Sequence, residues 1–340
     1  MAEATIFDVA RLAGVSKSTV SRVINGSQAV TDETREKIEK AMEELRYTPS
    51  AAARTLSSKQ TNVIGVIFPD SSEYFFGQLL KGIIQEADAH SMVVMQCNSY
   101  HDPEKEGRAL KMLAQQRIRG LIITPTLEKY ENPEYRQQVV DMLKSFNVPI
   151  VFVDRCIIGL AKDGVMFDNY QGGFLAGKTI AAARPKNVGA IVVDTALTLG
   201  RDRLRGFKDG LAVCGAEADQ GNIFTSKSQM SEEEILHVSR KLLDKLVPGG
   251  AVFMSNGFVS KIFLREVNGR KLKLGEDIHC VAFDRIELLE TYTDLAFQYI
   301  DRSEREMGRC AAKMLLQRIA GEAGPEKQYV ISAKLHNNIQ

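Results

Sequence analysis

A short segment near the start of the chain gathers small hydroxyl side chains and cations. Residues 16–22 read SKSTVSR, so four hydroxyl side chains stand beside Lys17 and Arg22. Hydroxyl and cationic side chains are the protein groups that most often contact phosphate oxygens. The segment is too polar for a hydrophobic core and too cationic for an ordinary solvated helix. It favours binding of an anion, with helix capping and exposed surface as the alternative interpretation.

The cations around this segment are separated from the acids. Residues 9–30 hold three cations and no acid, and residues 45–69 hold three more, again without an acid. The acids of the region lie between these stretches, from Asp32 to Glu44. The formal net charge of the whole chain is +1, so global charge favours no class of partner. The local pattern predicts an oriented domain with one face toward an anion and another toward water.

Three helices are predicted over residues 1–48, and they position this segment. The first covers about residues 6–13 and ends at Gly14, where a left-handed turn costs little. Ser16 is a suitable N-cap for the second helix, and Thr31 for the third. Apolar residues at helical spacing give the third helix a buried face. Two helices joined by a tight glycine-containing turn, closed by a third, predict a helix-turn-helix domain.

The next stretch, residues 49–61, reads as a hinge. Pro49 can begin a short helix, but Leu56 is its one large apolar side chain, so that helix needs a partner to be stable. From residue 62 onward, apolar β-branched runs alternate with helical patterns, which predicts parallel sheets covered on both faces. The alternation recurs after residue 168 and predicts two similar α/β lobes. Ligands of such sheets bind beyond the carboxyl ends of the strands, so a cleft between the lobes is the expected pocket.

The predicted fold is therefore an all-α helix-turn-helix headpiece plus an α/β core of two lobes, each a doubly wound parallel sheet. The core covers residues 62–340. We expect the N-lobe to hold about residues 62–165 and 297–325, and the C-lobe about residues 166–296 and 326–340.

Several classes of protein lack support in the sequence. The five cysteines are scattered and never form CxxC, which predicts reduced thiols and no metal site. No secretion signal and no run of roughly 18 apolar residues is present, so a cytoplasmic protein without a membrane segment is expected. No P-loop, GxSxG or HExxH motif occurs and the five histidines stand alone, so we expect no enzyme, no cofactor and no metal.

The amino-terminal pattern resembles the signature of the lactose/galactose repressor (LacI/GalR) family. The matching residues read IxDVAxxAGVSxxTVSxxIN over 6–25, and PxxxAxxL over 49–56 is similar to the family's hinge helix. The core carries FF at 75–76, VDR at 153–155, RLRGF at 203–207 and EMG at 306–308, in the family's order. The resemblance implies a DNA-binding transcriptional regulator that acts as a repressor and not as an enzyme. It also implies a periplasmic-binding-protein-like core. Such proteins bind a near-palindromic operator in double-stranded DNA as homodimers under control of a small molecule.

The resemblance also implies roles for individual residues. The second helix would lie in the major groove, where an arginine pairs with guanine. Leu56 would act as a wedge in the minor groove. The implied base contacts are Lys17, Ser18 and Arg22. The implied phosphate contacts are Thr5, Ser16, Thr19, Ser21, Asn25, Thr31 and Thr34. The implied hinge contacts are Ser50, Ala53, Arg54 and Leu56.

The implied effector site lies in the core, with Phe75 and Phe76 as a stacking wall. The implied polar contacts are Asp154, Arg155, Arg203, Asn256, Asp284 and Arg302. Two positions depart from the family pattern: Gly257 stands where many relatives have aspartate, and Arg302 where many have glutamine. Because arginines recognise carboxylate and phosphate, we expect an anionic effector, such as a sugar acid or a sugar phosphate.

Other interpretations remain open from the sequence. In one, Arg155 and Arg302 pair with nearby aspartates across the domain interface. In others, a neutral sugar or a protein partner controls the regulator. A sugar-binding protein without a DNA role would share the core but would lack the patterns at 6–25 and 49–56. No heptads follow Leu335, so a dimer rather than a tetramer is expected.

Overall fold

The structure is a computed structural model that describes residues 4–24, 29–47, 61–126, 133–157, 159–160, 162–286 and 297–337. It divides into two compact units. One is Met1–Asn62 with Arg117–Arg119, and the other is Val63–Gln116 with Gly120–Gln340. Within the described residues, no helix is both long enough and apolar enough to cross a membrane.

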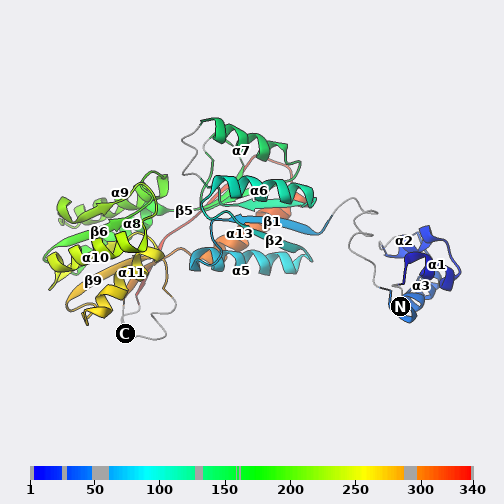
Figure 1. Ribbon diagram of the computed structural model, residues 1–340, viewed down its shortest axis with the longest axis horizontal. Helices are drawn as coiled ribbons and strands as arrows, with labels where there is room; N and C mark the ends of the chain where they lie inside the picture. The colour runs from blue at the N-terminus through cyan, green and yellow to red at the C-terminus, as the bar shows by residue number, and fades with distance from the viewer. Residues whose placement is uncertain are drawn as a thin grey trace. The chain divides into compact units, whose positions relative to one another are not determined.

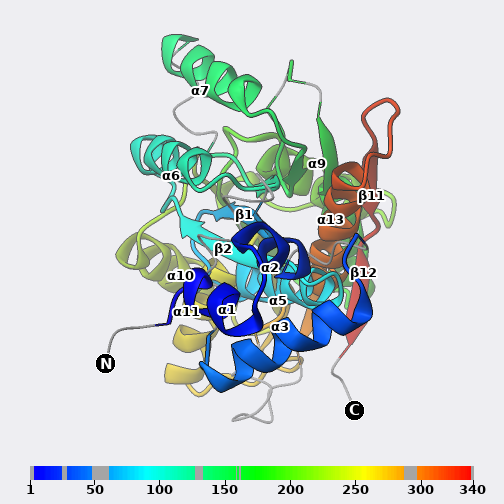
Figure 2. The ribbon, with the colours of Figure 1, turned by 90° about the vertical axis from the view of Figure 1, so that its right-hand side faces the viewer.

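The first unit contains the three predicted helices. They are α1 (Ile6–Ala13), α2 (Lys17–Ile24) and α3 (Asp32–Glu44). α1 ends at Gly14, which has the left-handed φ of 66° that the turn requires. Ser16 Oγ accepts from Thr19 N at 3.2 Å at the start of α2. α3 packs against both other helices (Figure 2), and their shared core is Val9, Ala10, Val20, Val23, Ile38 and Ala41. The predicted helix-turn-helix domain is confirmed.

The first lobe of the second unit, the N-lobe, is built on a parallel sheet of six strands. In spatial order these are β2 (Val93–Asn98), β1 (Val63–Phe68), β3 (Gly120–Ile123), β4 (Ile150–Val153), β5 (Asp163–Phe167) and β11 (Gln328–Ile331). Figure 1 shows helices on both faces of this sheet. One face carries α5 (Tyr74–Ala89) and α13 (Glu304–Ile319), and the other carries α6 (Pro103–Gln115) and α7 (Pro133–Ser145).

The C-lobe repeats this arrangement. Its sheet runs β7 (Ile223–Thr225), β6 (Val188–Val192), β8 (Gly250–Met254), β9 (Ile278–Phe283), β10 (Gln298–Asp301) and β12 (Lys334–Asn337), with only β12 antiparallel. The helices α8 (Asn169–Ala182) and α9 (Thr198–Ala212) cover one face, while α10 (Glu232–Leu246) and α11 (Gly257–Gly269) cover the other (Figure 1). A short 3-10 helix, η1 (Gln220–Asn222), precedes β7. The predicted fold class of two α/β lobes is confirmed.

The expected lobe boundaries are wrong for two short carboxy-terminal strands, although α13 packs on the N-lobe sheet and β12 joins the C-lobe sheet as expected. Residues 297–325 were expected in the N-lobe, but β10 pairs with β9 of the C-lobe. Residues 326–340 were expected in the C-lobe, but β11 pairs with β5 of the N-lobe, and β5 itself runs to Phe167. A strand of four residues has too little pattern to indicate which of two similar sheets it joins. Long-range contacts decide instead: just before β11, Lys327 N donates to Asp163 Oδ1 of β5 at 2.7 Å.

Glycines allow α8 and α9 to pack closely. A Cβ atom at Gly173 or Gly177 would lie 2.2 Å from a backbone oxygen of α9. A Cβ atom at Gly206 would lie 2.1 Å from Tyr170 O, and one at Gly210 2.2 Å from Phe174 O. No real Cβ atom lies so near a carbonyl oxygen, so the two backbones touch only because these positions are glycine. The contact fixes α9 relative to the start of α8.

Candidate nucleic-acid interface and effector site

The second helix of the headpiece exposes the predicted base-contacting residues. Val20 and Val23 are buried against α1 and α3, which leaves Lys17, Ser18 and Arg22 exposed on the outer side of α2. The first turn of α2 contains no acid. The positive end of the helix dipole therefore adds to the two cations, so this side of the headpiece attracts an anion.

The hydroxyl groups at the start of α2 form a local network. Ser16 Oγ lies 2.7 Å from Ser18 Oγ and 2.8 Å from Thr19 Oγ1. At α3, Thr31 Oγ1 lies 2.8 Å from Thr34 Oγ1 and accepts from Thr34 N at 3.4 Å. These contacts are helix caps, and exposed hydroxyls in them keep lone pairs and protons for a further partner.

Two of the predicted phosphate contacts need separate comment. Thr5 donates its hydroxyl to Asp8 Oδ2 at 2.6 Å, and hydrogen bonds from Thr5 hold the pKa of that carboxyl below its usual value. The Thr5 hydroxyl is thus engaged by an acid, which makes it less suited to phosphate than the other hydroxyls. Ser21 lies on α2 and is half-buried. Asn25, Ser50, Ala53, Arg54 and Leu56 lie outside the described residues.

One exposed aromatic residue in the headpiece escaped the sequence analysis. Phe7 of α1 is 62% exposed, and Lys17 Nζ lies 4.7 Å from the centre of its ring. This cation–π contact holds the Lys17 ammonium beside an apolar surface at the start of α2. The sequence did carry a signal for it: Phe7 is apolar but lies outside the helical spacing of the buried residues of α1.

In the core, three aspartates follow parallel strands in the same unusual backbone conformation. Asp154 follows β4, Asp284 follows β9, and Asp194 lies two residues beyond β6. Their φ angles are 65°, 76° and 57°, in the left-handed region, and all three residues are buried. Aspartate tolerates this region better than most residues, yet the conformation is strained. Strain and buried charge at strand ends are typical of a ligand site. Asp194 was not predicted.

Arg302 joins two of these aspartates. It stands between β10 of the C-lobe sheet and α13 of the N-lobe, and it is 4% exposed. Its Nη2 donates to Asp154 Oδ1, and its Nη1 lies 3.3 Å from Asp284 Oδ1. The guanidinium carbon lies 3.4 Å from the centre of the Phe75 ring and 5.4 Å from that of Phe167. Arg302 is thus paired with aspartates of both lobes, as in the alternative interpretation.

Arg203 is the second buried arginine of the site. Its Nε donates to Asn169 Oδ1 at 2.8 Å and its Nη1 to Ser255 O at 2.7 Å. Its guanidinium carbon lies 4.0 Å from the centre of the Phe283 ring. Burial, and then the positive charge of Arg302, lower the pKa of Arg203 to about 10, although three aspartates act in the opposite direction. The pKa nevertheless leaves Arg203 protonated at neutral pH.

Arg155 is less completely paired. Its Nε lies 3.4 Å from Asp154 Oδ2, but neither Nε nor Nη1 has a hydrogen-bond partner in the described part of the chain. The same is true of Arg302 Nε, Asp194 Oδ1 and Glu304 Oε1. Buried donors and acceptors without partners are costly, so these atoms mark positions where a ligand or water would be favoured.

The aromatic and amide predictions turn out differently. Phe76 is 3% exposed and packs in the hydrophobic core against Phe68, with ring centres 5.5 Å apart. Phe76 therefore lies on the side of α5 that faces the sheet, and its role in a stacking wall stays a prediction. Phe75 is covered by Arg302. Asn256 caps α11: its Oδ1 accepts from Val259 N at 2.8 Å, and its Nδ2 donates to Gln229 Oε1 at 3.1 Å.

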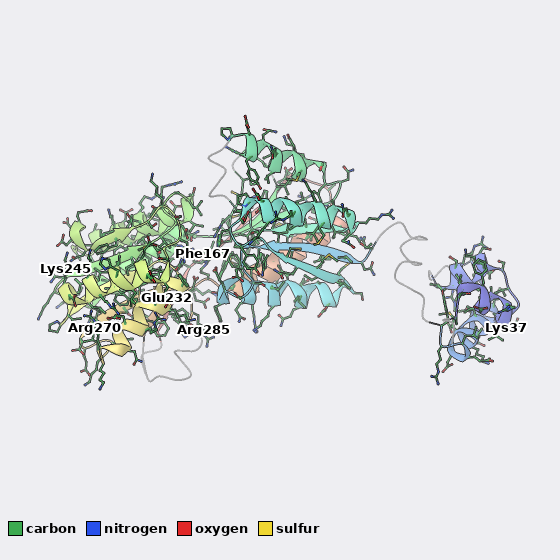
Figure 3. All side chains as sticks on the ribbon, in the orientation of Figure 1. Lys37, Phe167, Glu232, Lys245, Arg270 and Arg285 are labelled. Atoms are coloured by element: carbon green, nitrogen blue, oxygen red, sulfur yellow. The ribbon has the colours of Figure 1, made fainter. Side chains whose placement is uncertain are left out.

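Two further aromatic residues connect the arginines. Phe167 at the end of β5, labelled in Figure 3, and Phe283 at the end of β9 have ring centres 5.8 Å apart at nearly a right angle. They belong to one hydrophobic cluster with residues of both sheets. The arginines therefore lie where the two lobes meet, packed against these aromatic rings. The contact between Phe167 and Phe283 could not be predicted from the sequence, because an aromatic residue at the end of an apolar strand does not show which other strand end it will meet.

Two protein-family models match the chain. The model for bacterial regulatory proteins of the lacI family matches residues 5–50. The model for periplasmic binding proteins and the sugar binding domain of the LacI family matches residues 61–338. This chain belongs to the LacI family. The first match covers the helix-turn-helix domain of this LacI-family member, and the second covers both of its lobes.

Individual relatives agree with the family assignment. The HTH-type transcriptional regulator DegA of Bacillus subtilis (strain 168) is 31% identical over 286 residues, which cover 84% of this chain and 83% of DegA. The HTH-type transcriptional repressor PurR of Haemophilus influenzae (strain PittEE) is 30% identical over 328 residues, which cover 96% of this chain and 94% of PurR. These relatives are transcriptional regulators and not enzymes.

A solved structure of a family member has the same fold. The Lac repressor dimer bound to operator and the anti-inducer ONPF matches with a TM-score of 0.81 and 25% sequence identity. The match covers 99% of this chain and 98% of that chain. The LacI-family chain described here is thus a DNA-binding transcriptional repressor with a ligand-binding core.

Proposed function

We propose that this repressor binds a near-palindromic operator as a homodimer and is controlled by an anionic sugar derivative, a sugar acid or a sugar phosphate. It would act in the cytoplasm on nucleoid DNA. For DNA binding, the support is the exposed row of Lys17, Ser18 and Arg22 on α2, with capping hydroxyls at the helix start. In this arrangement Arg22 reads base edges, and the hydroxyls set the register of the helix on the phosphates.

The observation that carries the effector proposal is the set of buried guanidinium nitrogens without acceptors. Arg155 Nε and Nη1 and Arg302 Nε lack hydrogen-bond partners in the described chain. A carboxylate or phosphate supplies several acceptor oxygens and the negative charge that such donors favour. The unpartnered Asp194 Oδ1 would accept from a ligand hydroxyl. A molecule with an anionic group and hydroxyl groups is therefore the chemistry that supplies what these atoms lack.

A neutral sugar is the second candidate, and one observation favours it. Arg302 already pairs with Asp154 and Asp284, and two donors of Arg203 already have neutral acceptors in Asn169 and Ser255. Both arginines therefore have partners without an anion. In that case aspartate oxygens would bind the sugar hydroxyls. Control by a protein partner is a third interpretation, and no contact among the described residues supports it.

A thermal-shift screen followed by calorimetry separates these candidates. The screen pairs each anionic sugar with its neutral parent, for example glucuronate with glucose, because a ligand of the folded state raises the unfolding temperature. For an anionic ligand found in this way, Arg155→Gln is expected to weaken binding by roughly 10- to 150-fold, the loss of about 1.5–3 kcal/mol for a charged hydrogen bond. Arg240→Gln is the matched control, because Arg240 pairs with Glu266 on the surface of the C-lobe.

The result that contradicts the effector proposal is equally clear. Neutral parents that bind as tightly as their acids, together with unchanged binding in Arg155→Gln, would show that no guanidinium recognises the ligand.

A further inference from the structure

Arg302 occupies a place in the chain that connects the two lobes. The residue before it, Asp301, ends β10 in the C-lobe sheet, and the α13 helix of the N-lobe begins at Glu304. The side chain of Arg302 is more than nine-tenths buried.

The partners of Arg302 come from opposite lobes. Asp154 follows β4 of the N-lobe sheet, and Asp284 follows β9 of the C-lobe sheet. One nitrogen of the guanidinium binds each carboxylate. Without the guanidinium, two buried carboxylates would face one another, and like charges in a poorly solvated site repel strongly.

Aromatic rings and strained backbones hold this arrangement in place. Phe75 of α5 and Phe167 of β5 both lie within cation–π distance of the guanidinium. Both aspartates have left-handed φ angles, and their carboxylates bind the guanidinium. The planar guanidinium holds its N–H donors in a rigid fork and can bind two carboxylates at once. Neither glutamine nor lysine has this arrangement of donors.

We propose that Arg302 is a built-in ligand: its guanidinium ties Asp154 of the N-lobe to Asp284 of the C-lobe and holds the lobes together when no effector is bound. An anionic group that enters the site competes with the two aspartates for this guanidinium. Binding of the effector and release of the tie are then linked, because the Arg302 guanidinium cannot bind the anionic group and both aspartates fully at the same time. Only this competition rests on the proposed anionic effector; the tie itself does not.

Hydrogen–deuterium exchange of the full-length chain tests the tie directly. The amide of Asp154 donates to Val165 O within the N-lobe, and that of Asp284 donates to Ile300 O within the C-lobe. Peptides over these residues therefore report how firmly the tie holds the strand end that carries each aspartate. In Arg302→Met, which keeps the length of the side chain and removes its charge, these amides are expected to exchange at least ~10-fold faster than in the parent. Arg240→Met is the control, because Arg240 pairs with Glu266 inside one lobe, and it should leave these peptides unchanged.

A second variant keeps the test decisive if Arg302→Met does not fold, as judged by circular dichroism. Asp154→Asn with Asp284→Asn removes both negative charges and keeps the shapes of the side chains, and it too should exchange faster at these amides. Exchange at the parent rate in a folded Arg302→Met, or in the folded double variant when Arg302→Met does not fold, overturns the proposal.

The competition has a separate test. Glucuronate and glucose 6-phosphate serve as probes with the parent chain. Binding of either probe is expected to raise exchange at the Asp154 and Asp284 amides, and bound probe without such a rise overturns the competition. If neither binds, the proposed effector class loses its support, while the exchange of the variants still decides whether Arg302 ties the lobes.

Discussion

Replacing Gly206 with alanine should destabilise the C-lobe by forcing α8 and α9 apart. A Cβ atom there would lie 2.1 Å from Tyr170 O and 2.8 Å from Phe174 N. Ordinary contact begins near 3.4 Å, so the helices must separate by more than 1 Å or distort. Such overpacking costs about 1–3 kcal/mol, against which the better helix propensity of alanine returns about 0.5–1 kcal/mol. The separation would also strain the Arg203–Asn169 hydrogen bond, since the two residues lie on different helices.

Urea unfolding followed by circular dichroism measures this effect. Because the Cβ atom meets rigid backbone atoms, the cost lies near the upper end, about 3 kcal/mol, and the net loss is about 2–2.5 kcal/mol. With a slope near 3 kcal/mol per molar urea, this loss lowers the midpoint by roughly 0.7–0.8 M. Gly269→Ala is the control, because no atom lies within 4 Å of a Cβ atom at the end of α11, and it should leave the midpoint unchanged or slightly higher. Equal midpoints for Gly206→Ala and the parent would refute the conclusion that the backbones touch.

Three further predictions concern DNA binding and pH. Arg22→Ala should weaken binding to a selected operator by roughly 5- to 150-fold in a gel shift, from the ~1–3 kcal/mol of a base contact; Lys37→Ala, which removes an exposed pair with Glu33 on α3 (Figure 3), should change it little. Leu56→Ala should weaken operator binding strongly while a core ligand still binds, and an unchanged gel shift would dismiss the minor-groove wedge. Burial, and then Asp284, raise the pKa of Glu304 from 4.5 to about 7. The folded chain therefore holds a proton that the unfolded chain releases between these values, so stability should fall by up to about 3 kcal/mol as pH rises from 4.5 to 7. In Glu304→Gln, the urea midpoint should depend less on pH between 4.5 and 7 than in the parent. The same pH dependence in the variant and the parent would count against a buried neutral carboxyl.

The fold was largely predictable because its signals are local. Apolar spacing, the turn at Gly14 and the caps at Ser16 and Thr31 were enough to place the three helices of the headpiece. Alternating strand and helix patterns likewise indicated two α/β lobes. What failed was the assignment of β10 and β11 to lobes, because both sheets accept short apolar strands and distant contacts such as that of Lys327 N with Asp163 decide between them.

The candidate site was predictable as a set of residue types but not as a set of contacts. Arg302 stood out in the sequence by its departure from the family pattern, yet its pairing with Asp154 and Asp284 depends on two strand ends that meet only in the folded core. Phe76 was expected beside a ligand, and its burial follows from which side of α5 faces the sheet. Asp194 carried a usable signal, an aspartate just after an apolar strand, which its left-handed φ angle now explains.

The central claim is ligand-controlled, sequence-specific DNA binding, and fluorescence anisotropy tests it most directly. The full-length chain is first used to select a duplex from a random pool, and the labelled duplex is then titrated with and without glucuronate, with glucose as the neutral control. We expect tighter binding to the selected duplex than to a scrambled one and a steep loss of affinity with salt. We also expect the anionic sugar, but not glucose, to change the affinity by about tenfold or more. Equal affinity for the selected and scrambled duplexes would contradict sequence-specific binding. Titration curves that stay the same in the presence of every anionic sugar that binds the core would contradict the control of DNA binding by such ligands.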